Sequence, residues 1–378
     1  MAPPDVIVVG GGLHGCSVAL HLARRGARVT VLEKDQVGRH ASGVNAGGVR
    51  RLARDPAEIP LALEAMTMWH GIGALVDEDC GFRVSGQVMV AESAAELAAL
   101  RRRAALVRDL GYDHEEVIEA DALFRLLPAL AGHCVGGLLA REDGFADPAR
   151  TTRAFRRKAE SLGVRFREGC RVTGLRRAGG AWQVESTLGP LQAAILVNCA
   201  GAWAGEIAAA LGEPVPLEPI APMMMVTERL PPFLEPVVIG TGRPLSFKQQ
   251  PNGTVLIGGG HRARIAGERT VLDFARLAAS AATVCDLFPL MRGARVVRGW
   301  AGIEGRMPDD IPVIGASGQV EGAFHAFGFS AHGFQLGPVV GRIIAELASR
   351  EPASLPIAPF RIGRFAEGGA AGRPGFLP

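Results

Sequence analysis

Three glycines near the start of the chain, Gly10, Gly12 and Gly15, have the spacing of a phosphate-binding turn. Gly10 permits a tight turn, Gly12 lets the backbone approach a pyrophosphate, and Gly15 lets the next helix pack closely on the preceding strand. Glu33 stands about 20 residues further on, where a carboxylate accepts hydrogen bonds from an adenosine ribose. The spacing predicts a dinucleotide site, and by itself it leaves NAD and FAD open.

A strand, a helix and a second strand must position these residues. Residues 6–9 are four consecutive β-branched apolar residues, as in a buried parallel strand. A helical pattern covers 17–26, and a second strand is expected over 28–32. The free N–H groups and partial positive charge at the helix N-terminus would then face the phosphates.

A polar, glycine-rich loop is expected over 34–55. Structureless stretches of this length are uncommon inside a compact domain unless they bind something. The small residues of this loop would let its backbone lie flat against a planar ring, and Asn45 would supply directional hydrogen bonds. A disordered surface loop is the alternative, which Val44 and Val49 disfavour.

The composition is that of a globular chain with two joined domains. Its 378 residues are 48% hydrophobic and 21% charged, and the net charge of +3 is too small to indicate nucleic-acid binding.

The chain has no run of 18 apolar residues, and its first strand begins too early for a signal peptide. We therefore expect no membrane span and a cytoplasmic location. The six cysteines form no CxxC or CxxH pair, so we expect no metal site.

The order of the predicted elements indicates an α/β fold, α+β overall. Patterns of βαβ type lie at both ends and in the middle of the chain, with β-rich blocks between them. We expect a Rossmann-like domain that binds the cofactor and a mixed β-sheet domain that binds the substrate, both discontinuous. The first comprises 1–85, 145–212 and 298–360, the second comprises 86–144 and 213–297, and 361–378 form a C-terminal tail.

Several individual elements are also expected. Asp147 precedes Pro148 and is a plausible N-cap of the helix that follows. The patterns predict helices over 56–77, 148–163, 269–287 and 339–349, and a β-meander over 164–198.

Segments spread over nearly the whole chain resemble the D-amino-acid oxidase-type FAD-dependent amine oxidoreductases. They are residues 8–15 with Glu33, 42–48, 198–203, 300–302 with 307–315, and 328–335. The stretch 41–50 looks closest to the branch that holds sarcosine oxidase β subunits, D-hydroxyproline dehydrogenases and opine oxidase β subunits. The resemblance implies FAD rather than NAD. Because 328–338 contains no cysteine, we expect the FAD to be non-covalent.

The resemblance also implies a reaction, the oxidation of a C–N bond next to a carboxylate. A hydride passes from carbon to flavin N5, and the imine hydrolyses in water. The amine must be neutral when the hydride leaves, so a site that lowers its pKa by desolvation would suffice. The electron acceptor is O2 or a redox partner protein, and the similarity to β subunits favours a partner. The alternative is a flavin-bound subunit with a structural or regulatory role.

The residues expected to contact FAD come from the glycine turns and the resembling segments. Backbone N–H groups of 330–336 would face the flavin C2 carbonyl and N1, where negative charge accumulates on reduction. The full set is Gly10, Gly12, Leu13, His14, Gly15, Glu33, Lys34, Ser42, Asn45, Ala46, Gly47, Gly48, Val172, Ala200, Gly201, Trp203, Gly302, Gly328, Phe329, Ser330, Ala331, His332, Gly333, Phe334 and Gln335.

Four side chains are candidates for work on the flavin or the substrate. His332 lies in the C-terminal flavin segment, where it either contacts flavin or substrate or caps the loop. Arg50 and Arg51 follow the flavin loop. The resemblance to sarcosine oxidases implies that a basic residue here lies over the flavin face or helps to hold the carboxylate, and the alternative is a solvated surface position. Lys248, next to Phe247 on a strand of the substrate domain, faces either the site or solvent.

The chain departs from the family pattern at the residue that holds the substrate carboxylate. Many relatives place an arginine shortly after the Trp-Ala-Gly strand for this purpose. Glu304 stands at that place here, and Arg306 lies two residues further on. Either Arg306 substitutes with shifted geometry or the substrate is bound differently. A carboxylate at 304 favours a cationic or secondary-amine group nearby, which points to cyclic imino acids, N-alkyl amino acids and opines rather than simple D-amino acids.

Overall fold

The computed structural model describes residues 3–366 of the chain. A six-stranded sheet of order β23-β24-β13-β1-β2-β9 lies at the centre of one half of the molecule. Its five strands from β24 to β9 run parallel, and β23 is antiparallel. The strands are β23 (Val313–Ala316), β24 (Ala323–Phe327), β13 (Ile195–Asn198), β1 (Val6–Val9), β2 (Val29–Leu32) and β9 (Arg165–Arg167). The predicted Rossmann-like arrangement is confirmed.

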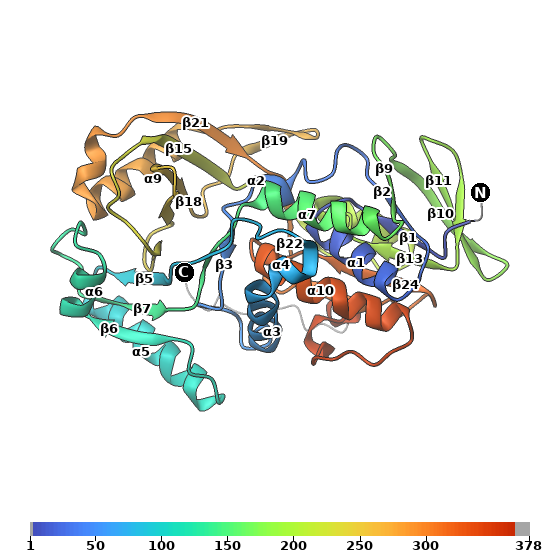
Figure 1. The fold of residues 1–378 in the computed structure, drawn as a ribbon, viewed down its shortest axis with the longest axis horizontal. Coiled ribbons are helices and arrows are strands. Elements are labelled where there is room, and N and C mark those ends of the chain that lie inside the picture. Colours follow the sequence, from blue (N-terminus) through green and yellow to red (C-terminus); the bar gives the residue numbers. More distant parts are fainter. Residues whose placement is uncertain (1–2, 367–378) are drawn as a thin grey trace.

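Both faces of this sheet are covered, as the unbroken apolar run of β1 requires. Val6 and Val8 pack into one hydrophobic cluster, and Ile7 and Val9 pack into another on the opposite face. The first face is covered by α1 (Leu13–Arg24), α3 (Ile59–His70), α7 (Pro148–Ser161) and α10 (Gly333–Ala348). The second is covered by β10 (Val172–Ala178), β11 (Ala181–Ser186), β12 (Leu191–Ala193) and α8 (Ala204–Ala210). Figure 1 shows α1 and α7 side by side above α10.

The meander predicted over 164–198 is wrong at both ends. Strands β9 and β13 pair in parallel with β2 and β1, so only β10, β11 and β12 form an antiparallel meander. The reason is visible in β13, whose apolar residues are buried in the centre of the sheet, as is typical of parallel strands.

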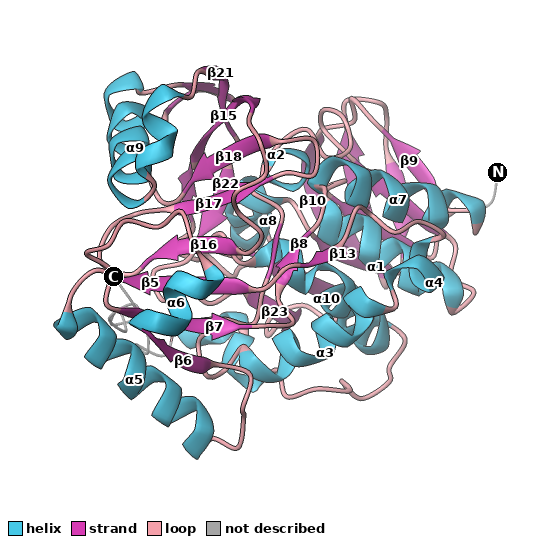
Figure 2. Ribbon diagram, turned by 60° about the vertical axis from the view of Figure 1, so that its left-hand side comes forward, coloured by secondary structure: helices cyan, strands magenta, loops and turns pink. Residues whose placement is uncertain are grey.

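An eight-stranded sheet of order β21-β15-β18-β17-β16-β5-β7-β6 forms the second half. Neighbouring strands are antiparallel except β16 and β5. Its strands are β21 (Val296–Ala301), β15 (Met223–Arg229), β18 (Thr254–Gly258), β17 (Ser246–Gln249), β16 (Val237–Gly240), β5 (Gln87–Ala91), β7 (Gly136–Ala140) and β6 (Glu116–Glu119). Figure 2 shows α9 (Phe274–Leu287) beside the upper strands and α5 (Ala94–Asp109) beneath the lower ones, with α6 (Ala120–Leu126) in front.

Side chains of this sheet alternate between its two faces. Val88 and Val90 belong to the cluster that includes α9, whereas Met89 and Ala91 pack with α5. Phe247 likewise lies in the α9 cluster, with its ring centroid 4.9 Å from that of Phe288. The residue after Phe247 must therefore point to the opposite face, toward the first half of the molecule.

Two predicted helices are shorter than expected. The helix predicted over 269–287 begins only at Phe274, because Arg269–Val271 form β20 and pair with β19 (Arg264–Ala266) in a hairpin. Asp273 then caps α9 with its carboxylate. The helix predicted over 56–77 is divided at Gly71 into α3 and α4 (Ile72–Val76).

The region 34–55 is not structureless, which corrects that expectation. It contains the short helix α2 (Ala41–Val44) and strand β3 (Gly48–Val49). Strand β3 pairs with β8 (Gly144–Phe145), which also pairs with β4 (Arg83–Val84). A second small pairing joins β14 (Glu218–Ile220) to β22 (Glu304–Arg306). These two small sheets lie where the chain crosses between the two halves.

The predicted N-cap Asp147 is confirmed, because its carboxylate accepts a hydrogen bond of 2.8 Å from the Arg150 N–H at the start of α7. Replacing Asp147 by alanine should lower the free energy of unfolding by about 1 kcal/mol, measured by urea titration. Asparagine caps as well as aspartate, so Asp147→Asn is the matched control. An equal loss in both variants would show that charge, not capping, is responsible.

The predicted tail is only partly described. Residues 361–366 include a 3-10 turn over Ile362–Phe365, and Ile362 is buried, so this part packs against the protein rather than forming a loose arm. The rest of the predicted tail, 367–378, lies outside the described residues. Within residues 3–366, no helix combines the length and the hydropathy needed to cross a membrane.

Candidate active site

A cavity of about 640 Å³ extends from the glycine turn before α1 to the inner face of the eight-stranded sheet. All the residues predicted to contact the cofactor line this cavity except Gly15 and Gln335. Of the predicted catalytic residues, His332, Lys248 and Glu304 line it, as does Arg50, whereas Arg51 and Arg306 do not. Segments from distant parts of the sequence thus meet around one space.

The glycine turn has the close packing that its spacing predicts. Gly10 has φ of +106°, and a Cβ there would lie 2.2 Å from the carbonyl oxygen of Cys199. A Cβ on Gly15 would lie 1.9 Å from the carbonyl oxygen of Gly10. Gly15 therefore faces the turn that precedes α1, and it allows close packing there without lining the cavity. Ser42 completes the turn, because its Oγ accepts a 2.9 Å hydrogen bond from the Leu13 N–H.

Glu33 is held rigidly at the end of β2. One carboxylate oxygen accepts a 2.7 Å hydrogen bond from the Gly11 N–H, and the other accepts a 2.8 Å bond from the Asp35 N–H. The carboxylate is therefore oriented before any ligand binds, and its remaining lone pairs are available to a ribose hydroxyl.

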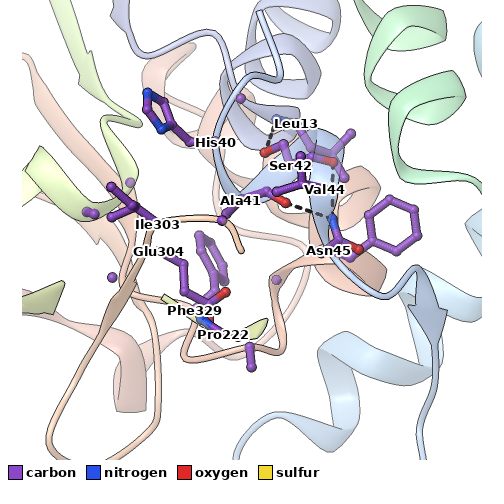
Figure 3. A pocket seen from close by; sticks show the side chains of 18 of the residues that line it. Leu13, His40, Ala41, Ser42, Val44, Asn45, Pro222, Ile303, Glu304 and Phe329 are labelled. Carbon is purple, nitrogen blue, oxygen red and sulfur yellow. Dashed lines mark hydrogen bonds between the residues drawn. The ribbon is translucent and has the colours of Figure 1, made fainter. Parts of the chain in front are cut away.

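Asn45 has a different task from the one predicted. Its Nδ2 donates to the carbonyls of Ala41 and Ser42 at 3.0 and 3.1 Å, and its Oδ1 accepts a 2.7 Å bond from the Gly47 N–H. Figure 3 shows the two bonds from the Asn45 amide to the Ala41 and Ser42 carbonyls of α2. The Asn45 amide therefore shapes the loop instead of offering its hydrogen bonds to a ring.

Helix α10 begins at Gly333, six residues earlier than predicted, and it contains Pro338 within its span. The helix continues through the proline because it packs tightly on α1, where Ser17 Oγ donates a 3.4 Å hydrogen bond to the Pro338 carbonyl. The preceding loop adopts positive φ at Gly328, Ser330 and Ala331. As the loop and the first residues of α10 line the cavity, the positive end of the helix faces it.

Gln335 does not line the cavity, which corrects its predicted role. Its side chain is buried between α10 and α3, where Nε2 donates a 2.7 Å hydrogen bond to the Ala62 carbonyl and Oε1 accepts a 3.1 Å bond from Arg54. The residue holds two helices together beneath the cavity.

Two stacked rings form part of the cavity wall. The His14 and Phe329 ring centroids lie 3.7 Å apart with an angle of 3° between the planes. Burial lowers the pKa of His14 to about 3, so its imidazole is neutral at physiological pH. The pair is an apolar wall and not a charged group.

Lys248 points from β17 into the cavity and is only 3% exposed. Its Nζ donates a 2.5 Å hydrogen bond to the Ala46 carbonyl and lies 4.3 Å from the centre of the Phe145 ring. Burial lowers the pKa of Lys248 to about 7, against the opposing charge of Asp147. The amine can therefore hold or release a proton near neutral pH.

A buried charged cluster that the sequence reasoning did not identify lies behind His332. Arg54 donates hydrogen bonds of 3.2 Å to the His332 carbonyl, and Glu58 Oε2 lies 3.4 Å from His332 Nδ1. Burial lowers the pKa of His332, and Glu58 opposes this effect. Burial alone would raise the pKa of Glu58, but His332, Arg54 and Arg50 hold it below its usual value. The four-residue spacing of 50, 54 and 58 was the only sequence signal of this cluster.

Arg51 and Arg306 lie outside the cavity, which corrects their predicted contacts with flavin or substrate. Arg51 Nε pairs with the buried Asp143 at 3.1 Å, and Arg306 Nε pairs with Asp310 at 2.7 Å. Two residues along a strand correspond to about 7 Å, which carries Arg306 past the end of the cavity that Glu304 lines.

Replacing Arg306 by alanine should therefore leave the KM for the best substrate within about twofold of the wild-type value, since its ion pair with Asp310 is partly exposed. Steady-state kinetics at several substrate concentrations test this expectation. A tenfold rise in KM would instead restore Arg306 as a carboxylate clasp.

Glu304 also lines the cavity, and in Figure 3 it lies near Phe329 and Pro222. Its Oε1 is buried and has no hydrogen-bond partner among the described residues. Burial raises the pKa of Glu304 to about 7, and the charge of Arg262 opposes this. In residues 3–366, no group of three or more His, Cys, Asp or Glu side chains is arranged to hold a metal ion.

Comparisons with known proteins agree with this geometry. Residues 5–347 match the family model described as DAO, FAD dependent oxidoreductase. Sarcosine oxidase subunit beta of Rhizobium meliloti is 29% identical over 379 residues, which cover 96% of this chain and 89% of that protein. Glycine oxidase of Geobacillus kaustophilus is 25% identical over 375 residues, covering 95% of this chain and 97% of that protein. The crystal structure of L-proline dehydrogenase from P. horikoshii superposes with a TM-score of 0.90 and 25% identity, covering 97% and 98% of the two chains.

Proposed function

The chain belongs to the DAO family of FAD-dependent oxidoreductases, and from this premise we propose that it oxidises the C–N bond of an amino or imino acid. The substrate class comprises cyclic secondary amines, N-alkyl amino acids and opines, and the imine product hydrolyses or is released. The names of similar proteins, which refer to sarcosine, glycine and proline, support this class. The observation that carries the proposal is one cavity that joins the glycine turn to Lys248 and Glu304.

The residues present suit FAD. Any Cβ at Gly10 or Gly15 would collide with neighbouring backbone, so these glycines permit the tight turn that a pyrophosphate site needs. Glu33 is oriented for a ribose, and the positive end of α10 faces the cavity. When bound, FAD supplies N5 as the acceptor of the substrate hydride. We propose non-covalent attachment, because the loop before α10 contains no cysteine.

The chain's own residues would bind and orient the substrate. Lys248, when protonated, would hold the substrate carboxylate, because its buried charge has no carboxylate partner within hydrogen-bond distance among the described residues. Apolar residues such as Met224 and Ile303, with the His14–Phe329 pair, would exclude water. Exclusion of water lowers the pKa of a substrate amine and favours its neutral, reactive form.

The same proposal includes the division into domains. All strands of the six-stranded sheet fall within 1–85, 145–212 and 298–360, and those of the eight-stranded sheet fall within 86–144 and 213–297, apart from β21, which spans the boundary at 298. A cytoplasmic location and assembly with a redox partner subunit also belong to this proposal. The resemblance to a protein named subunit beta supports the second point.

Anaerobic reduction of the bound flavin tests the function. The purified protein is mixed with proline, hydroxyproline, pipecolate, sarcosine, opines and D-amino acids, and loss of the flavin absorbance near ~450 nm is recorded. We expect at least one secondary amino acid to bleach the flavin. Rapid return of colour in air indicates an oxidase, whereas slow return indicates a partner acceptor. A flavin that no compound bleaches would favour the alternative, a non-catalytic flavin-bound subunit.

A further inference from the structure

We propose that Glu304 is the ammonium site of the cavity: its carboxylate receives the protonated amine of the substrate and takes one proton from it. This inference rests on the proposed function and deepens it. It assigns a role to the one residue at which the chain reverses the charge expected from its family.

The position of Glu304 makes it a ligand-facing group. It lies at the start of β22, opposite Ile220 of β14, directly after Gly302 and Ile303, which also line the cavity. Its Oε1 is buried without a hydrogen-bond partner among the described residues. A carboxylate oxygen in this state loses its hydration and gains nothing in return, so the arrangement is costly unless a ligand supplies the missing partner.

The charged residues around Glu304 are engaged elsewhere. Glu218 on β14 lies 3.6 Å from Arg262 and 3.8 Å from Arg306, and Arg306 also pairs with Asp310. Arg262 lowers the pKa of Glu304 through its charge without contacting the carboxylate at ion-pair distance. Lys248 and His332 line the same cavity, but Lys248 donates to the Ala46 carbonyl and His332 pairs with Glu58. A cation from the ligand would neutralise the Glu304 carboxylate without a proton from solvent.

The proton transfer is balanced. One N–H bond of the substrate ammonium breaks, one O–H bond forms on Glu304, and the freed electron pair stays on nitrogen. A buried ion pair becomes two neutral groups, which suits a cavity that excludes water. The neutral amine is then the species that can lose a hydride, and the proton on Glu304 leaves to solvent after the product has gone. Burial raises the pKa of Glu304 to about 7 and lowers that of a buried amine, so the two values approach each other.

The substrate must therefore place its reacting nitrogen, and not its carboxylate, beside Glu304. This orientation differs from one in which an arginine at 304 would hold the carboxylate. It selects ammonium ions whose carboxylate binds at a separate cation.

The test uses the holoenzyme with Glu304→Gln and Glu304→Asp. In the wild type, kcat/KM for the best substrate should decrease as the pH is lowered below about 7, because protonated Glu304 cannot accept a proton. This decrease is the acid limb of the pH profile. Glu304→Gln should lose this acid limb and at least about 100-fold of kcat/KM at pH 8, whereas Glu304→Asp should keep the limb at a reduced rate.

A binding measurement gives a second readout that does not depend on turnover. The ether analogue of the best substrate, with oxygen in place of nitrogen, can only accept a hydrogen bond at that position. Its affinity, measured from the perturbed flavin spectrum, should rise more steeply as pH falls through 7 in the wild type than in Glu304→Gln, where only the protonation of Lys248 still changes across this range.

The two proposals fail in different ways. If no compound reduces the wild-type flavin, the proposed function fails. If substrates reduce the wild type but Glu304→Gln keeps the acid limb and the same analogue affinities, the ammonium site is overturned while the function stands. A third result would also overturn the ammonium site: Glu304→Gln keeps the acid limb and loses activity only toward substrates that carry a second, distant ammonium group. Glu304 would then bind that distant cation and not the reacting amine.

Discussion

Replacing Gly15 by alanine is expected to abolish FAD binding. The added Cβ would lie 1.9 Å from the carbonyl oxygen of Gly10, and the clash is with backbone, which no side-chain rotation can relieve. Either α1 moves away from β1 or the turn at Gly10 opens, and both movements displace the groups that would hold the pyrophosphate. Flavin absorbance after desalting and a fluorescence titration of the apoprotein should give an affinity at least about 100-fold below that of the wild type.

Gly73→Ala is the matched control for this substitution. Gly73 lies in α4, is exposed, and has nothing within 4 Å of its built Cβ. Alanine there should retain FAD fully and stabilise the protein by up to about 1 kcal/mol, because glycine is a poor helix former. A Gly15→Ala protein that purifies yellow with one FAD per chain would show that the turn tolerates the shift.

The parts of the fold predicted from sequence are those with strong local signals. The run 6–9, the glycine spacing and Glu33 identify β1, α1 and β2 because strand, turn and helix follow one another without interruption. The Asp147 cap was found in the same way, from a capping residue before proline. Such features depend on neighbours in the chain, which a sequence displays directly.

The parts that could not be predicted depend on distant partners. The last helix is predicted to begin at residue 339, yet α10 begins at Gly333 and continues through Pro338, where it packs against α1. Asn45 looks like a ligand residue, and only the folded loop shows that its amide is already used by Ala41, Ser42 and Gly47. The four-residue spacing of Arg54 and Glu58 does not by itself indicate a site, because their shared neighbour His332 lies 278 residues after Arg54 in the sequence.

Lys248→Met is expected to lower activity and raise stability together. Methionine fills a similar volume but removes the cation proposed to hold the substrate carboxylate, so kcat/KM should fall about 100-fold, as for other buried charged contacts. In the wild type, KM should rise above pH 7, where Lys248 loses its proton, and in the variant KM should not depend on this titration. Lys158→Met, which removes a lysine paired with Asp77 on the surface of α7, is the matched control.

The stability change follows from the sign of the pKa shift. The folded-state pKa of Lys248 is depressed from 10.5 to about 7, so between these values the unfolded chain binds more protons than the native protein. The free energy of unfolding of the wild type therefore rises as pH increases from about 7 to 10.5, and it falls again as pH decreases toward 7. At or below pH 7 the buried amine costs up to about 5 kcal/mol, at 1.36 kcal/mol per pH unit.

Urea unfolding at pH 7, 8 and 9 should consequently show Lys248→Met to be more stable than the wild type, by a margin that shrinks by about 1.4 kcal/mol per pH unit. The lost hydrogen bond to the Ala46 carbonyl reduces the gain by about 1 kcal/mol without changing its slope. A lysine kept only for structure would give the opposite result, a less stable variant with unchanged kinetics. Higher stability combined with lower activity would mean that the protein tolerates a destabilising buried amine because the reaction needs it.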